Sequence, residues 1–151
     1  MATPARRLIL ENLKTTLEGI TVANGYKTNV LTVEPLAKSF ADTPTSLKPW
    51  IGVHPQREAL TYEQGGNIRS VLTVLLICHI SGNSPDERSE DLNDLLDDII
   101  AILDVDTTRG TNAVMTTITT VETDEGDPDA KGQGSMVVSC DVTYFRTGSS
   151  S

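Results

Sequence analysis

Residues 84–103 read SPDERSEDLNDLLDDIIAIL, and this segment decides the fold class of the chain. Ser84 suits a helix N-cap, Pro85 the first helical position, and Glu87 completes a capping box with the serine. Large aliphatic side chains then follow the spacing of one helix face: Leu92, Leu95, Leu96, Ile99, Ile100 and Leu103. The segment is therefore predicted to be a helix whose apolar stripe covers a sheet.

The same segment carries seven carboxylates and one arginine. The carboxylates opposite the apolar stripe are Glu90, Asp91, Asp94, Asp97 and Asp98. A hard cation needs oxygen ligands that converge from several directions, whereas side chains on one convex helix face diverge. We interpret these acids as the solvated side of the helix.

The chain before this segment predicts one helix and three strands. A helix starts at Thr3-Pro4, ends at Gly19 or Asn24-Gly25, and buries Ile9, Leu13, Leu17 and Ile20. Short strands are expected at 30–33, ended by Pro35, and at Trp50–His54, where Pro55 indicates an edge or a strand end. A third strand, Ile68–Ile80, follows the Gly65-Gly66-Asn67 turn and is apolar at both parities from Val71 onward.

Two further strands, Ala113–Glu122 and Ser135–Arg146, are expected to form a hairpin around the polar run TDEGDPDAKGQG. Its tip carries four acids, Asp124, Glu125, Asp127 and Asp129. The order is helix, three strands, helix, two strands. The sequence thus predicts an α+β fold with a mixed or antiparallel sheet of about five strands, in a single domain over 1–147 with a flexible tail at 148–151.

Length and composition agree with one globular domain. The chain has 151 residues, of which 38% are hydrophobic. The longest apolar run, Val71–Ile80, is shorter than the roughly 20 residues of a membrane span, so no membrane association is expected. The run Leu8–Leu10 after Arg6 and Arg7 is too short for a signal peptide, which predicts a protein made in the cytoplasm. Cys78 and Cys140 lie among aliphatic residues and are expected to be buried and reduced.

The net charge of −9 is unevenly distributed. Residues 1–75 hold eight basic and six acidic residues, a net +2, whereas 76–151 hold four basic and fifteen acidic residues, a net −11. An acidic surface repels nucleic-acid phosphates, and the chain shows no basic patch with interleaved aromatics. Specific binding of DNA is not expected.

No segment predicts a catalytic or metal centre. DVDTTRG at 104–110 resembles the start of a calcium loop, but its glycine comes one residue late and Met115 stands where a bidentate Glu is needed. Cys78 and His79 are neighbours on a strand and would point to opposite faces, so they cannot share one zinc ion. No enzyme activity, cofactor or metal is expected.

The connection Leu36–Pro49 is long for a compact domain. Leu36, Phe40 and Leu47 interrupt its polar background and would need a surface to bury against. We interpret it as a candidate docking loop for an adjacent subunit or another protein, although folding back onto its own domain is the alternative.

Four segments, together with the long apolar strand Ile68–Ile80, resemble the tail terminator, or tail completion, proteins of long-tailed bacteriophages, and the order of elements matches along Leu8–Thr147. The four segments are ENLKTTLEGITVANGYKTNV at 11–30, PWIGVHPQRE at 49–58, ERSEDLNDLLDDIIAIL at 87–103 and VVSCDVTYFRT at 137–147. The resemblance implies a structural virion protein at the tail–neck junction that forms a ring, usually hexameric. Such a ring caps the tail tube, contacts the major tail tube protein and the neck or connector protein, and lets DNA pass through its bore. The acids at the hairpin tip, Asp124, Glu125, Asp127 and Asp129, are then candidates to face that bore.

Three other readings belong to different classes. A neck or head-closure protein of the same joint would share the size and acidity of this chain. An acidic DNA mimic would need carboxylates in two extended rows, and an enzyme would need a site. Solution mass separates a ring from a DNA mimic.

Overall fold

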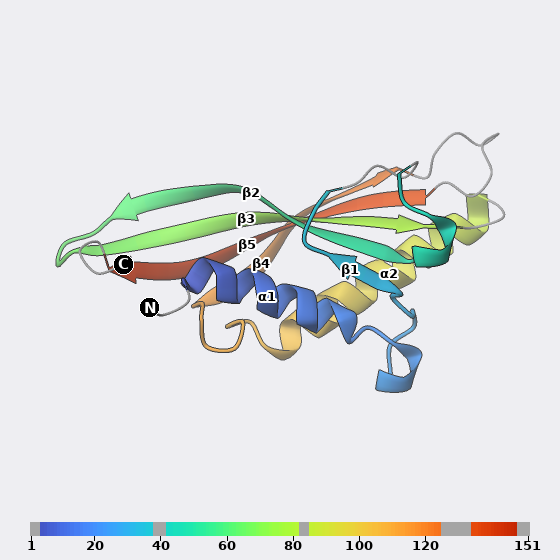
Figure 1. Ribbon diagram of the computed structural model, residues 1–151, viewed down its shortest axis with the longest axis horizontal. Helices are drawn as coiled ribbons and strands as arrows, with labels where there is room; N and C mark the ends of the chain where they lie inside the picture. The colour runs from blue at the N-terminus through green and yellow to red at the C-terminus, as the bar shows by residue number, and fades with distance from the viewer. Residues whose placement is uncertain (1–3, 38–41, 82–84, 125–133, 148–151) are drawn as a thin grey trace.

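The computed structural model describes residues 4–37, 42–81, 85–124 and 134–147, and in it two helices lie on one face of a five-stranded sheet (Figure 1). The helices are α1 (Ala5–Glu18) and α2 (Pro85–Val105). The strands are β1 (Thr32–Glu34), β2 (Trp50–Tyr62), β3 (Asn67–Ile80), β4 (Met115–Asp124) and β5 (Gly134–Thr147). The predicted α+β class and order of elements are confirmed.

The strands lie in the order β1-β2-β3-β5-β4, so β3 and β5 form the centre of the sheet. β1 pairs with β2 in parallel, and the other neighbours are antiparallel, which makes the sheet mixed. β3 and β5 stay in register from Asn67 opposite Thr147 to Ile80 opposite Gly134. β2, β3 and β5 project together beyond the start of α1 (Figure 1).

Strand boundaries differ from expectation most at β2, which was predicted to end near Pro55 but runs on to Tyr62. The register of β2 on β3 shifts between Pro55 and Arg57. β1 pairs only with Trp50–Gly52, so the outer edge of β2 has no partner strand at Pro55. A proline costs little at a position where the ladder is irregular and one edge is free.

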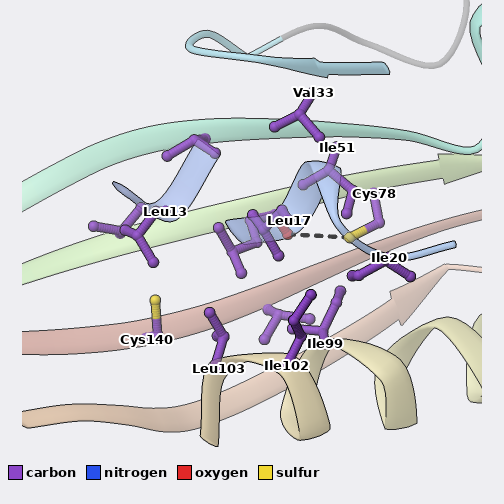
Figure 2. Packing of buried hydrophobic residues seen from close by; sticks show 14 of the residues in the cluster. Leu13, Leu17, Ile20, Val33, Ile51, Cys78, Ile99, Ile102, Leu103 and Cys140 are labelled. Carbon is purple, nitrogen blue, oxygen red and sulfur yellow. Dashed lines mark hydrogen bonds between the residues drawn. The ribbon is translucent and has the colours of Figure 1, made fainter. Parts of the chain in front are cut away.

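The hydrophobic core fills the space between the helices and one sheet face (Figure 2). β3 and β5 contribute alternate side chains to it, as the two-residue period of a strand requires. From these strands the core receives Leu72, Val74, Leu76, Cys78, Val138, Cys140 and Val142. Both cysteines are fully buried and free, as predicted, and burial raises the pKa of each thiol to about 12.

The buried stripe of α2 is rotated from the predicted one. Leu92, Leu95, Ile99 and Leu103 are buried as expected, but Leu96 is only partly buried and Ile100 is 40% exposed. Ile102 is buried instead, and Asp98, predicted on the solvated side, is also buried. The helix is turned so that Asp98 faces the segment after α1. This rotation moves Ile100, on the opposite side of the stripe, toward solvent.

Neither helix among the described residues combines the length and the hydropathy that crossing a bilayer requires.

Replacing Leu95 with alanine should lower the free energy of unfolding by about 2–5 kcal/mol, since the side chain is fully buried and its loss leaves a cavity. Ile100→Ala is the control on the same helix and should cost much less. Urea denaturation of the two variants measures the difference. Equal losses would show that α2 does not present this face to the sheet.

Candidate functional site: the open sheet face and the sheet edges

The segment after β1 closes one end of the sheet face that the helices leave uncovered. A Cβ placed on Gly52 would lie 2.2 Å from the carbonyl oxygen of Leu36 and 2.5 Å from the Trp50 ring, so only glycine fits there. The Leu36 side chain remains 37% exposed. Of the predicted docking residues, Leu36 thus has its backbone packed against its own domain, while its side chain is partly exposed.

The other two predicted docking residues are separated along the connection. Leu47 ends a short 3₁₀ helix, Thr45–Leu47, and its side chain is partly buried. Phe40 lies outside the residues that the structure describes. The role of this segment in docking therefore stays a prediction.

Trp50 and His79 form a stacked pair on the same face, which sequence reasoning did not find. Their ring centroids are 5.3 Å apart and their planes differ by 12°. Trp50 Nε1 donates to Glu34 at 2.9 Å, and His79 Nδ1 lies 2.8 Å from the Ser135 hydroxyl. The pair arises from strand register, because Trp50 lies directly opposite His79. As predicted, Cys78 points to the other face, into the core.

The remainder of this face is open. On β3 and β5 the side chains of Val71, Leu75, Ile77 and Val137 are only partly buried. Beyond them, Met115 is 54% and Phe145 50% exposed. The prediction that β3 is apolar at both parities therefore corresponds to one face under the helices and one that no helix covers.

Two sheet edges also lack a partner strand among the described residues. β4 pairs only with β5, so its outer edge is free along the strand. β1 covers only the first three residues of β2, which leaves the outer edge of β2 free from Val53 onward. Free edges present unpaired N–H and C=O groups and are natural sites for pairing with another chain.

A groove of about 610 Å³ runs beside the free edge of β2. Its apolar floor comes from Leu10, Pro35, Val53 and Pro55, and its rim carries Glu11 and three basic residues, Arg6, Arg7 and Lys14. We call α1, this groove and the free edge of β2 the α1/β2 shoulder. We call α2 and the free edge of β4, at the opposite edge of the sheet, the α2/β4 shoulder.

The two shoulders differ sharply in charge. α1 and β2 together hold four basic and three acidic residues, whereas α2 and β4 hold one basic and ten acidic residues. The charge asymmetry between the halves of the sequence therefore becomes an asymmetry across the sheet, because α1 packs on β1 and β2 while α2 packs on β5 and β3.

Part of the acidic side of α2 has a structural role. The buried Asp98 carboxylate accepts hydrogen bonds from the backbone N–H groups of Lys27 and Thr28 at 2.8–3.1 Å. The hydrogen bond from Lys27 Nζ to Asp97, at 3.0 Å, raises the pKa of the lysine, and Asp94 lies 4.0 Å from the same nitrogen. These contacts fasten the turn after α1 to α2.

The segment that resembles a calcium loop is also explained by local hydrogen bonds. Asp106 accepts from the Thr108 hydroxyl at 2.6 Å and from the backbone N–H groups of Thr108 and Gly110 at 2.9 and 2.7 Å. These bonds lower the pKa of Asp106 to about 2. The fully buried Arg109 donates to the Leu103 carbonyl at 2.8 Å and also to that of Asp106. Within the described ranges, no group of three His, Cys, Asp or Glu side chains could hold a metal ion.

A polar cluster lies on the helix side of the sheet beside the start of α1. Tyr144 donates from its hydroxyl to Glu58 Oε2 at 2.9 Å, and Arg146 Nη2 donates to the same oxygen at 2.6 Å. Arg6 Nε lies 3.5 Å from the other oxygen of Glu58. Burial, reinforced by the hydrogen bond to Glu58, raises the pKa of Tyr144 to about 12.

The predicted acidic tip is described only at its first residue. Asp124 is the last residue of β4, and its backbone pairs with Ser135 of β5. Glu125, Asp127 and Asp129 lie outside the described residues. Their proposed position in a bore stays a prediction.

Comparison with known proteins adds no family. No protein-family model matches the chain, and no curated protein matches it significantly.

Asp98→Ala should lower the free energy of unfolding by about 1.5–3 kcal/mol, because it leaves the N–H groups of Lys27 and Thr28 without a charged acceptor. Asp97→Ala removes only an exposed ion pair and should cost about 0.2–1 kcal/mol. Chemical denaturation of both variants provides the comparison. If Asp97 proves the more important, the turn is not held as described.

Tyr144 should titrate near pH 12 in the folded protein, a step visible in phenolate absorbance and missing from Tyr144→Phe. Since the folded pKa lies above the ordinary value of about 10, the neutral hydroxyl favours folding. Its contribution is complete below about pH 10 and is lost as the pH rises through 12. Glu58→Gln should move the step to lower pH; a step that stays in place would exclude the carboxylate as a cause.

Proposed function

We propose that this protein is a structural subunit of a homo-oligomeric ring, most simply a hexamer, that caps the tail tube of a long-tailed bacteriophage. The ring would join the tube to the neck below the capsid and leave an axial bore for DNA. This function is the one implied by the resemblance of residues 11–30, 49–58, 87–103 and 137–147 to tail terminator proteins.

The observation that supports a self-assembling subunit best is the incomplete cover of the sheet. Both helices lie on one face, and within the part of the chain that the structure describes β2 and β4 each present a free edge. The open face carries Val71, Leu75, Ile77 and Val137, which are only partly buried. Solvent-facing strands normally show polar side chains, and an apolar sheet surface favours contact with another protein.

The charge of the chain suits a bore through which DNA passes. A net charge of −9 repels phosphates and disfavours adhesion of DNA to the ring wall. DNA is then a passing cargo, and the binding partners are other copies of this chain, the tail tube protein and the neck protein.

The competing DNA-mimic function fits the acidic helix less well. A mimic needs carboxylates free to contact a nucleic-acid-binding protein. Asp98 is instead buried against the turn after α1, and Asp97 is paired with Lys27. These acids serve the fold, which favours the structural function over the mimic.

Static light scattering combined with electron microscopy tests the proposal. Six copies of the 16.3-kDa chain would give a particle of about 98 kDa, and images should show rings, free or on the ends of tail tubes. The tubes are those of the phage that encodes the chain. A chain that remains a monomer at high concentration and forms no ring on tube ends would contradict the proposal.

A further inference from the structure

The outer edge of β4 is suited to pairing with another strand. It is ten residues long, from Met115 to Asp124, and includes five threonines with Ile118 and Val121, all of high β-propensity. Natural edge strands are often blocked by lysine or proline, and β4 contains neither. One register irregularity, between Ile118 and Thr120, interrupts it.

The free edge of β2 is suited to receive a strand of different character. Beyond the irregularity at Pro55, residues 57–62 continue as regular strand. Beside this edge lies the groove with the apolar floor and the basic rim of Arg6, Arg7 and Lys14. In the single subunit these side chains pair with Glu58, Glu11 and Glu18, respectively, and the pairs of Arg7 and Lys14 are exposed and therefore weak. An incoming element should therefore combine apolar and acidic side chains.

The α2/β4 shoulder of the same chain has this combination. Ile100 on α2 is 40% and Val121 on β4 37% exposed, and both are apolar. Exposed carboxylates accompany them: Asp104 lies on α2, and Glu122 follows Val121 on β4 but points to the open face, opposite Val137. α2 and β4 hold ten acidic residues against one basic. Asp98 is buried and Asp94 and Asp97 lie at Lys27, so it is the remaining exposed acids that are complementary to the basic rim and repel a second copy of the shoulder.

We infer that neighbouring subunits join head to tail, with the α2/β4 shoulder of one copy seated on the α1/β2 shoulder of the next and the free edge of β4 lying against the free edge of β2. This inference rests on the proposed ring and specifies its contact. Because the two shoulders are different surfaces, the contact is heterologous, and a heterologous contact that closes by rotation produces a ring. A contact of α2 with α2 would oppose like charges and is disfavoured.

Two double variants, each blocking one shoulder, test the contact. Arg7→Glu with Lys14→Glu reverses the basic rim, and Asp104→Lys with Glu122→Lys reverses the acidic shoulder. All four side chains are on the surface, so neither variant should unfold, as circular dichroism can verify. Each variant alone should assemble at least tenfold more weakly than the unmodified chain in light scattering at low salt.

Mixing the two variants distinguishes a head-to-tail contact from a symmetric one. The basic-rim variant retains a working α2/β4 shoulder, and the acidic-shoulder variant retains a working α1/β2 shoulder. The two reversed shoulders, one now acidic and the other now basic, are also complementary to each other, so the mixture should recover the assembly that each variant alone has lost. Symmetric homodimers of either variant, or no association in the mixture while both remain folded, would overturn the inference.

Two single charge reversals, one of each sign, serve as controls away from the shoulders. Arg69→Glu lies on the open face of β3 and Glu63→Lys in the turn after β2, and both should assemble like the unmodified chain. If the two double variants also assemble normally, the shoulder contact is wrong but the ring is not. If the unmodified chain itself never assembles, the proposed function fails with it.

Discussion

The pairing of β3 with β5 is the constraint on which the rest of the structure depends. Because these strands stay in register from end to end, they hold Leu72, Leu76 and Cys140 on a single face. The apolar stripes of α1 and α2 can then be buried together on that face, at roughly 1.5–3 kcal/mol for each fully buried large aliphatic side chain. Among the described residues, the other face carries no helix, and the outer edge of β4 and most of the outer edge of β2 have no partner strand. A linear sheet always has two edges, and the three residues of β1 are too few to close one of them.

The parts of the fold that local pattern controls could be read from the sequence. The proline-led start of α2 at Pro85, its aliphatic spacing and the apolar run of β3 determine the class and order of elements. The rotation of α2 could not be read, because it depends on the carboxylate of Asp98 binding backbone groups of Lys27 and Thr28, some 70 residues away. Helical periodicity alone treats Asp98 and Asp97 alike. The length of β2 was missed for a similar reason. A strand can continue through a proline where its outer edge has no partner strand, and the sequence does not show which edge is free.

The sequence predicted two features of the candidate site, its charge and the apolar character of β3 at both parities. The difference between the two halves of the sequence is visible in composition, but its meaning depends on strand order, which places α1 at one edge of the sheet and α2 toward the other. Strand order also creates the Trp50–His79 stack and the close passage of Leu36 over Gly52. The acidic side of α2 consequently has two roles: Asp98 fastens the turn after α1, while exposed acids such as Asp104 supply the charge of the α2/β4 shoulder.

Hydrogen–deuterium exchange, compared between the free subunit and the assembled protein, tests most directly whether the sheet edges join the subunits. The amides between β3 and β5 should exchange slowly in both states, since they lie at the centre of the sheet. The outward-facing amides of β4 and of residues 57–62 should exchange quickly in the free subunit and become protected on assembly. Edge amides that exchange equally fast in both states, with new protection confined to other surfaces, would contradict the edge-to-edge contact.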